Sequence, residues 1–168
     1  MSSILHNHDL VFENVWRTDL RQVGDQVLNI WMLHRGPKGK AARERLKELV
    51  YVVKNNRGEV VGISTAFKAH VKQLRNYFFV FRLMIIPGYR VPGLTSRLLV
   101  LTRDFLESIH STETEDKPVG LVTLVENDDL KIHRNEAIWP ASKMVYIGNS
   151  KEGHHIRVYY FAGARILP

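Results

Sequence analysis

Seven consecutive residues carry the clearest chemical signal in this sequence. Positions 90–96 read Arg-Val-Pro-Gly-Leu-Thr-Ser and lie between an apolar run and an amphipathic pattern. Gly93 has no Cβ and permits close approach of an anion to the backbone, while the ionised guanidinium of Arg90 offers donors suited to phosphate oxygens. Where such a turn opens a helix, unpaired N–H groups and the positive end of the helix dipole meet at one point. The segment therefore predicts a phosphate-binding site.

Two elements must position this turn. Residues 76–86 are almost continuously apolar, which predicts a central strand covered on both faces, and Pro87-Gly88 ends it. After Gly93, apolar residues recur at helical spacing, at Leu94, Leu98, Leu101, Phe105, Leu106 and Ile109. The spacing predicts a helix of about four or five turns that begins directly after the turn.

The N-terminal part predicts a strand and two helices. The strand is expected over residues 9–15, and Thr18 is expected to cap the first helix. The apolar positions of that helix fall on one face: Leu20, Val23, Val27, Ile30 and Trp31. Gly36-Pro37 ends this pattern, and residues 40–49 predict a short, strongly charged helix on the surface.

The remaining segments are rich in β-forming residues. Strands are expected over 49–54 and 60–71, joined by a turn at residues 55–58 whose Asn and Gly residues suit positive φ. Further elements are predicted as a strand over 119–125, a short helix over 128–137, and strands over 144–147 and 156–161. The order β-α-α-β-β-β-α-β-α-β-β predicts an α/β fold in which a mixed sheet carries helices on both faces. With 168 residues and 45% hydrophobic residues, the chain is expected to form a single domain over residues 1–168.

The turn and its setting resemble the signature of the GNAT acyltransferase superfamily. That signature is Arg or Gln, two residues, Gly, one residue, then Gly or Ala, and here it reads Arg90-Val91-Pro92-Gly93-Leu94-Thr95. The preceding Leu83-Met84-Ile85-Ile86-Pro87-Gly88-Tyr89 also looks like the strand ending of this family. Thr95 departs from the pattern because it places a β-branched side chain where Gly or Ala is usual. The resemblance implies a central, mostly antiparallel mixed sheet.

The resemblance further implies that acetyl-CoA, or another acyl-CoA, is the co-substrate. The backbone near Met84, Ile85 and Ile86 would then meet the pantetheine arm, and the pyrophosphate would bind at Arg90, Val91, Pro92, Gly93, Leu94, Thr95 and Ser96. Asn127 stands where many relatives have an Asn that contacts the same arm. Asn127 could equally be the N-cap of the helix that follows it.

The catalytic residues implied by the family are less complete. An amine acceptor near pKa 10.4 must lose a proton before it attacks the thioester. The usual strand Glu is absent, and Glu126 is the best replacement, although Glu126 could equally be a solvent-exposed loop residue. Trp139 occupies the slot of the Tyr that protonates the leaving thiolate, and an indole N–H is too weak an acid for this step. Tyr146 and His133 are the alternatives, although a strand Tyr is often a core residue. His154-His155 has no evident third ligand, so no metal is assigned.

Charge and composition limit the classes of partner. The sequence has a net charge of +7 and no Cys, which favours anionic partners and excludes disulfides and cysteine chemistry. Neither a membrane span nor a secretory signal is evident, so a cytoplasmic protein is expected. One stretch concentrates the positive charge, at Arg35, Lys38, Lys40, Arg43, Arg45 and Lys47. These residues form either a solvated surface or a binding patch for a partner.

Two functions from different classes are therefore compatible with the sequence. The first is an acyl-CoA-dependent N-acyltransferase that transfers acetyl to an amine of a protein or small molecule by direct attack. The second is a noncatalytic GNAT-fold module that recognises an acidic protein or, less well, a nucleic acid, because the basic stretch lacks an interleaved aromatic row. Edges of the last two strands commonly pair in this family, which makes a homodimer a further expectation.

Overall fold

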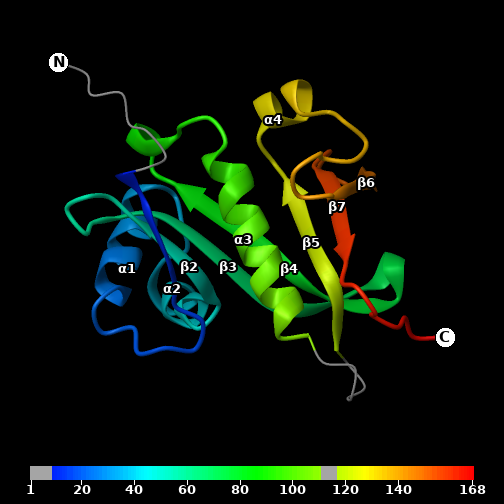
Figure 1. The fold of residues 1–168 in the computed structure, drawn as a ribbon, viewed down its shortest axis with the longest axis horizontal. Coiled ribbons are helices and arrows are strands. Elements are labelled where there is room, and N and C mark those ends of the chain that lie inside the picture. The colour runs from blue at the N-terminus through cyan, green and yellow to red at the C-terminus, as the bar shows by residue number, and fades with distance from the viewer. Residues whose placement is uncertain (1–8, 111–116) are drawn as a thin grey trace. The chain divides into compact units, whose positions relative to one another are not determined.

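The computed structural model describes residues 9–110 and 117–168 (Figure 1). The elements of this part are β1 (Val11–Asn14), α1 (Gly24–Leu33), α2 (Gly39–Leu46), β2 (Leu49–Lys54), β3 (Val60–Val71), β4 (Asn76–Ile85), α3 (Leu94–Ser108), β5 (Pro118–Val125), α4 (Asp128–His133), β6 (Val145–Asn149) and β7 (His155–Tyr160). Short 3-10 helices at Lys72–Leu74 and Pro87–Tyr89 adjoin β4. The predicted order of strands and helices is confirmed.

The strands are hydrogen-bonded in the order β1-β2-β3-β4-β5-β7-β6, so that β4 is the middle strand of seven. β4 and β5 are parallel, whereas β1 with β2, β2 with β3, β5 with β7, and β6 with β7 are antiparallel. This arrangement confirms the predicted mixed, mostly antiparallel sheet. β6 lies at one end of the order, and within the described residues its outer edge meets no further strand but forms an isolated antiparallel bridge from Val145 to Ile138.

Several predicted boundaries were wrong. Thr18 does not cap α1: its hydroxyl donates to the carbonyl oxygen of Val15 at 3.0 Å, and the helix begins only at Gly24, after Val23. α2 ends at Leu46, three residues before the predicted end. α4 ends at His133, since Arg134 is its C-cap and the next residues form no helix.

The chain forms two compact units. The first combines residues up to Thr65 with Leu83–Thr102, and the second combines Ala66–Arg82 with Arg103–Pro168. β3, β4 and α3 therefore each contribute residues to both units. Among the described residues, no helix is long and apolar enough to cross a membrane.

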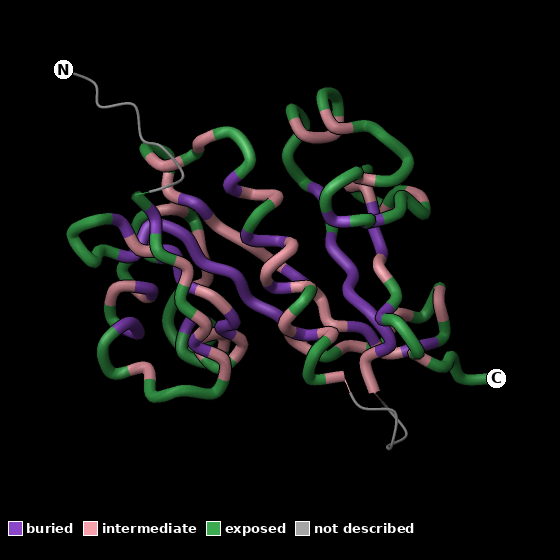
Figure 2. The backbone as a smooth tube through the Cα atoms, in the orientation of Figure 1, coloured by how far each residue is buried: buried purple, intermediate pink, exposed green. Residues whose placement is uncertain are grey.

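The first unit buries both faces of its strands. On one face, Val27 and Trp31 of α1 and Ala42 of α2 pack with Val52 and Ile63. The other face packs against the first turns of α3 and contains Leu10, Val53, Val61, Ile85, Leu94 and Leu98. Figure 2 shows the result as buried stretches along β2 and β3. The predicted placement of helices on both faces is confirmed within this unit.

The core of the second unit lies on one face of β4, β5 and β7. Phe78, Val119, Val122, Ile156 and Val158 form this cluster, and all are at most 7% exposed. β7 is paired along its whole length with β5, from Gly120 opposite Tyr160 to Val125 opposite His155. This pairing fixes the position of His155 relative to the end of β5.

Gly120 allows the close approach of β7, because a Cβ at this position would overlap the carbonyl oxygen of Tyr159 and lie 3.0 Å from the Cα of Tyr160. We expect Gly120→Ala to lower the free energy of unfolding by about 1–3 kcal/mol or more, as overpacking does in cores. Urea denaturation followed by circular dichroism measures the change. Gly88→Ala is the control, since a Cβ there meets nothing within 4 Å. Equal stability of the Gly120→Ala variant and the wild type would contradict this packing.

Candidate functional site

The turn between β4 and α3 is anchored in the core at both ends. Ile85, the last residue of β4, is 4% exposed, and Leu94 and Leu98 of α3 are fully buried in the same cluster. Between these anchors, Arg90, Pro92 and Gly93 are exposed. The apolar residues therefore fix the ends of the turn and leave its middle accessible.

The backbone conformation at position 93 favours glycine. Its φ is 82°, in the left-handed region that a side chain disfavours. The carbonyl oxygen of Gly93 accepts the N–H of Arg97 at 2.9 Å, and the N–H of Leu94 donates to Val91 at 3.3 Å. α3 begins immediately afterwards. The predicted strand–turn–helix geometry is confirmed, and it places a helix N-terminus at this glycine.

Arg90 is held by the end of the strand that precedes it. Its Nε donates to the carbonyl oxygen of Ile85 at 3.1 Å, which orients the guanidinium and leaves its terminal nitrogens for other acceptors. The next backbone N–H, that of Ile86, donates to Val61 at 3.0 Å. Thus two of the backbone groups predicted to meet a pantetheine arm, the Ile85 carbonyl and the Ile86 N–H, already have partners in this structure.

The surroundings of the turn are cationic. The first turn of α3 contains no acidic residue, and Arg97 lies exposed with its guanidinium 4.3 Å from the ring centroid of Phe12. Thr95 and Ser96 are half-buried and add two hydroxyl groups. Positive charge, hydroxyl donors and a helix N-terminus fit the phosphates of a nucleotide co-substrate. Thr95, where the family has Gly or Ala, is compatible with this donor set.

The hairpin between β2 and β3 supports the turn from the side. Asn55 is 4% exposed, and its amide donates to the hydroxyl oxygen of Tyr89 at 2.9 Å. The side-chain oxygen Oδ1 of Asn55 accepts the backbone N–H groups of Arg57 and Glu59, both at 3.0 Å. Gly58 has a φ of 77°, as the predicted turn requires. The sequence indicated this hairpin but not that its Asn fixes the residue next to Arg90.

Glu126 and Asn127 lie in the second unit, directly after β5. Glu126 is exposed and has no side-chain hydrogen bond or ion pair within the described residues. The side chain of Asn127 accepts the N–H of Leu130 at 3.0 Å and caps α4. The cap that the sequence predicted as one of two roles for Asn127 is therefore present. Its predicted contact with a cofactor remains a prediction.

Tyr146 lies on the edge strand β6 and is 40% exposed, so the expectation of a core tyrosine was wrong. Its hydroxyl donates to Oδ1 of Asn149 at 2.9 Å, and its ring meets that of His155 edge-on at 5.1 Å. His133, the other candidate, is the exposed last residue of α4. Both side chains are therefore accessible to solvent, and the roles of Tyr146 and His133 as proton donors stay predictions.

Trp139 has a structural role next to a buried arginine. Its indole N–H donates to the carbonyl oxygen of Arg134 at 2.8 Å. The guanidinium of Arg157 lies 4.2 Å from the Trp139 ring centroid and 5.9 Å from that of Tyr146, although Arg157 is only 1% exposed. Two of its nitrogens face the carbonyl oxygens of Arg134 and Ala137 at 3.3 and 3.5 Å, whereas its Nε is buried without a partner.

No carboxylate contacts Arg157 among the described residues, and burial lowers the pKa of its guanidinium, an effect that nearby Glu136 opposes. Sequence reasoning missed this residue. Strand alternation alone would have placed Arg157 on the same face of β7 as His155, and register pairing places it opposite Tyr146. The guanidinium of Arg157 therefore places a positive charge next to the ring of Tyr146, the candidate proton donor.

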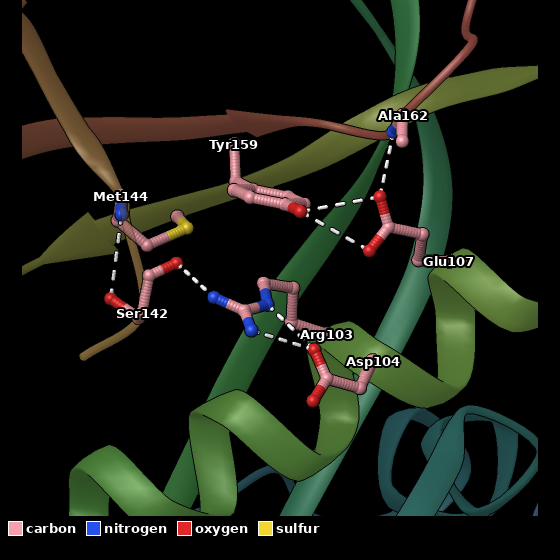
Figure 3. A network of polar contacts seen from close by, with 7 residues as sticks. All are labelled: Arg103, Asp104, Glu107, Ser142, Met144, Tyr159 and Ala162. Atoms are coloured by element: carbon pink, nitrogen blue, oxygen red, sulfur yellow. Dashed lines mark hydrogen bonds and ion pairs between the residues drawn. The ribbon is translucent and has the colours of Figure 1, made fainter.

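A second polar network holds β7 to the C-terminal half of α3 (Figure 3). Glu107 accepts the hydroxyl of Tyr159 at 3.1 and 3.2 Å and the N–H of Ala162 at 2.6 Å. Arg103 lies over the Tyr159 ring at 4.8 Å and donates to the carbonyl oxygen of Ser142 at 2.5 Å. Burial and the neighbouring Glu107 raise the pKa of Tyr159, so this phenol stays protonated. The network is structural.

His154 and His155 do not form part of a metal cluster in the described chain, where no group of three His, Cys, Asp or Glu residues is arranged for an ion. His155 is the first residue of β7 and pairs with Val125, so only His154 lies in the turn that was predicted to hold both. The basic residues from Arg35 to Lys47 lie in the first unit, in the loop between α1 and α2 and along α2.

No protein-family model matches the sequence, and no curated protein matches it. Solved structures do resemble it. The ribosomal-protein-S5-alanine acetyltransferase from Vibrio fischeri has a TM-score of 0.61 at 11% identity, over 96% of this chain and 98% of that one. A GNAT-family acetyltransferase from Streptococcus pneumoniae has a TM-score of 0.58 at 11% identity, covering 91% and 99%.

Arabidopsis thaliana Naa50, solved in complex with the bisubstrate analogue CoA-Ac-MVNAL, has a TM-score of 0.53 at 14% identity, with 91% of this chain and 99% of that one covered. At these identities the likeness concerns the fold. The strand order, the Gly93 turn that opens α3, and these structures agree. The chain has the fold of the GNAT acetyltransferase superfamily.

Proposed function

We propose that this protein is an acyl-CoA-dependent N-acyltransferase that transfers acetyl from acetyl-CoA to an amine of a protein or small molecule. The left-handed turn at Gly93, between the end of β4 and the N-terminus of α3, is the observation that carries the proposal. It presents cationic and hydroxyl side chains and a helix N-terminus without a nearby carboxylate in that first turn. The acetyltransferases of the same fold, one of them bound to a CoA-containing analogue, support this use of the turn.

In the proposed reaction, the amine attacks the thioester carbonyl directly and the CoA thiolate leaves. The acetyl thioester supplies the activated acyl group, and positioning of the two substrates supplies much of the rate enhancement. Glu126 is exposed and free to accept the amine proton, directly or through water. Tyr146 is the candidate donor to the thiolate, with its hydroxyl oriented by Asn149. Each of these two assignments remains a proposal.

A second candidate is a noncatalytic module of the same fold. The observation that favours it is that the indole N–H of Trp139, in the slot of the usual acid, is bonded to Arg134. Such a module would bind an acidic partner through the basic residues Arg35, Lys38, Lys40, Arg43, Arg45 and Lys47. Five of these six cations form no ion pair among the described residues, namely Arg35, Lys38, Lys40, Arg43 and Arg45.

Calorimetric titration with acetyl-CoA tests the turn. We expect the double variant Arg90→Ala, Gly93→Trp to lose detectable binding, because it removes a guanidinium and forces a large side chain onto a left-handed residue. Lys151→Ala, Gly153→Trp is the matched control, since Gly153 is exposed with a φ of 83°. Unchanged affinity in the Arg90 and Gly93 variant would overturn the assignment of the turn.

Asn127 permits its two predicted roles to be separated. Asn127→Asp keeps an N-cap acceptor, whereas Asn127→Ala removes it and should lower the free energy of unfolding by about 0.5–2 kcal/mol. If Asn127 also donates to the cofactor arm, both variants should bind acetyl-CoA more weakly, because neither retains the amide N–H donor. Wild-type affinity in both variants would leave capping as its role.

Tyr146→Phe tests the proposed proton donor. We expect kcat for CoA release from acetyl-CoA and a panel of amines to fall by about 100-fold, the lower range for a general acid, while the Kd for acetyl-CoA stays the same. Tyr160→Phe is the control, because Tyr160 is also an exposed tyrosine of the same region, at 48%. An unchanged kcat would exclude Tyr146 as the acid. Binding of acetyl-CoA without turnover on any amine would favour the noncatalytic module.

A further inference from the structure

The cations around the α1–α2 loop differ from most others in this protein in lacking partners. Arg35, Lys38, Lys40 and Arg43 form no side-chain hydrogen bond and no ion pair within the described residues. Elsewhere, Lys54 pairs with Glu13 and Arg57 with Glu59. Within the basic stretch, Lys47 alone is neutralised, by Glu44 at 3.0 Å. The result is a local excess of positive charge that is available to a partner.

Two exposed apolar side chains closely precede these cations in the sequence. Met32 and Leu33, in the last turn of α1, are 61% and 65% exposed, the two largest exposures of apolar side chains on this helix. The face of α1 that packs into the core is formed by other residues, the buried Val27, Ile30 and Trp31. Met32 and Leu33 therefore contribute nothing to the core of the unit.

The loop that presents the basic residues is held in a defined shape. Gly36 packs so closely on Trp31 that a Cβ at this position would lie 2.6 Å from the Trp31 Cβ, and its N–H donates to the Trp31 carbonyl oxygen at 2.8 Å. Arg35 has a φ of 59°, a left-handed conformation that costs a residue with a side chain about 1 kcal/mol or more. A glycine would fit position 35 without this cost. An arginine kept in a strained position indicates a role for its side chain.

We propose that the surface formed by Met32, Leu33, Arg35, Lys38, Lys40 and Arg43, the basic–apolar patch, docks an acidic segment of a protein that carries apolar anchor residues. This inference rests on the partner-binding function proposed above, and it names the chemistry of the partner. Carboxylates of the segment pair with the four cations, and its apolar side chains cover Met32 and Leu33. Met and Arg are among the residues enriched in protein–protein interfaces.

A protein segment fits this patch better than a nucleic acid does. Single-stranded nucleic acids are bound by basic grooves with aromatic rings on which bases stack. Here Trp31 is only 2% exposed, and none of the six residues of the patch is aromatic. A phosphate backbone would also leave the side chains of Met32 and Leu33 in contact with water or with charged phosphates, whereas the apolar face of an amphipathic peptide would cover them.

Fluorescence anisotropy with the full chain and synthetic probes tests the proposal. The probes are an amphipathic peptide with Glu and Leu at helical spacing, about 20 residues or roughly 30 Å long as a helix, its Glu→Gln and Leu→Ser counterparts, and a single-stranded RNA of similar length. We expect the acidic peptide to bind best. Each counterpart should bind at least about fivefold more weakly, and moderate salt should weaken binding of the acidic peptide.

Variants of the protein separate the two parts of the patch. Lys38→Glu, Lys40→Glu should weaken binding of the acidic peptide at least about tenfold, and Met32→Gln, Leu33→Gln should remove the preference for Leu over Ser in the peptide. Lys72→Glu, Lys151→Glu is the control, because it makes the same charge change at two exposed lysines of the second unit. This control should change the Kd less than about twofold.

Circular dichroism of the same variants shows whether they are folded and keeps this test independent of the acyltransferase proposal. A loss of peptide binding by a folded variant then reports on the patch alone, whatever the affinity for acetyl-CoA. Three results would overturn the inference: no binding of the acidic peptide, equal weakening by the Lys72 and Lys151 control, or tighter binding of the RNA with no effect of the Met32 and Leu33 variant. The last of these would reassign the patch to nucleic acid.

Discussion

The structure around the candidate site depends on one constraint, which is that β4 and α3 bury their adjoining ends in the same core. Ile85 and Leu94 are separated by only eight residues, yet both are buried in the cluster that also holds Leu98. The chain between them must change direction at the protein surface, and the left-handed backbone conformation of Gly93 makes this turn possible. The side chain of Arg90 reaches back and donates to the carbonyl oxygen of Ile85, the last residue of the strand. The apolar packing at both ends of the turn therefore determines where the exposed Arg90 and the N-terminus of α3 lie.

The sequence was most informative where burial and turn chemistry agree. β2 and β3 have the predicted bounds, because long β-rich runs flank a turn whose Gly58 needs positive φ. The prediction was wrong at Thr18. A threonine hydroxyl can cap a helix, but that of Thr18 forms a local hydrogen bond to the carbonyl oxygen of Val15 instead. α4 was predicted too long because its carbonyl at Arg134 is used by Trp139 and Arg157 instead of by a further helical turn. Such long-range side-chain bonds leave no periodic trace in a sequence.

The candidate catalytic region shows the same limit. The sequence suggested Glu126 and Tyr146 as residues able to exchange protons. It did not predict that the positive charge of Arg157 lies next to Tyr146. Arg157 is separated from Tyr146 by eleven positions and meets it only through the β6–β7 register. A buried guanidinium is costly to desolvate, and in this chain carbonyl oxygens and aromatic rings around Arg157 offset part of that cost. The resemblance to known structures gives the fold alone.

The four non-glycine residues with left-handed backbone among the described residues are all cations: Arg17, Arg35, Arg75 and Lys143. Glycine would remove the strain at each position, and stabilising substitutions of this kind are readily found because natural proteins are rarely at their stability optimum. Laboratory evolution for heat resistance alone would then be expected to replace these four positions early. Positions that resist replacement when selection also demands function would reveal which of these surface charges the organism uses.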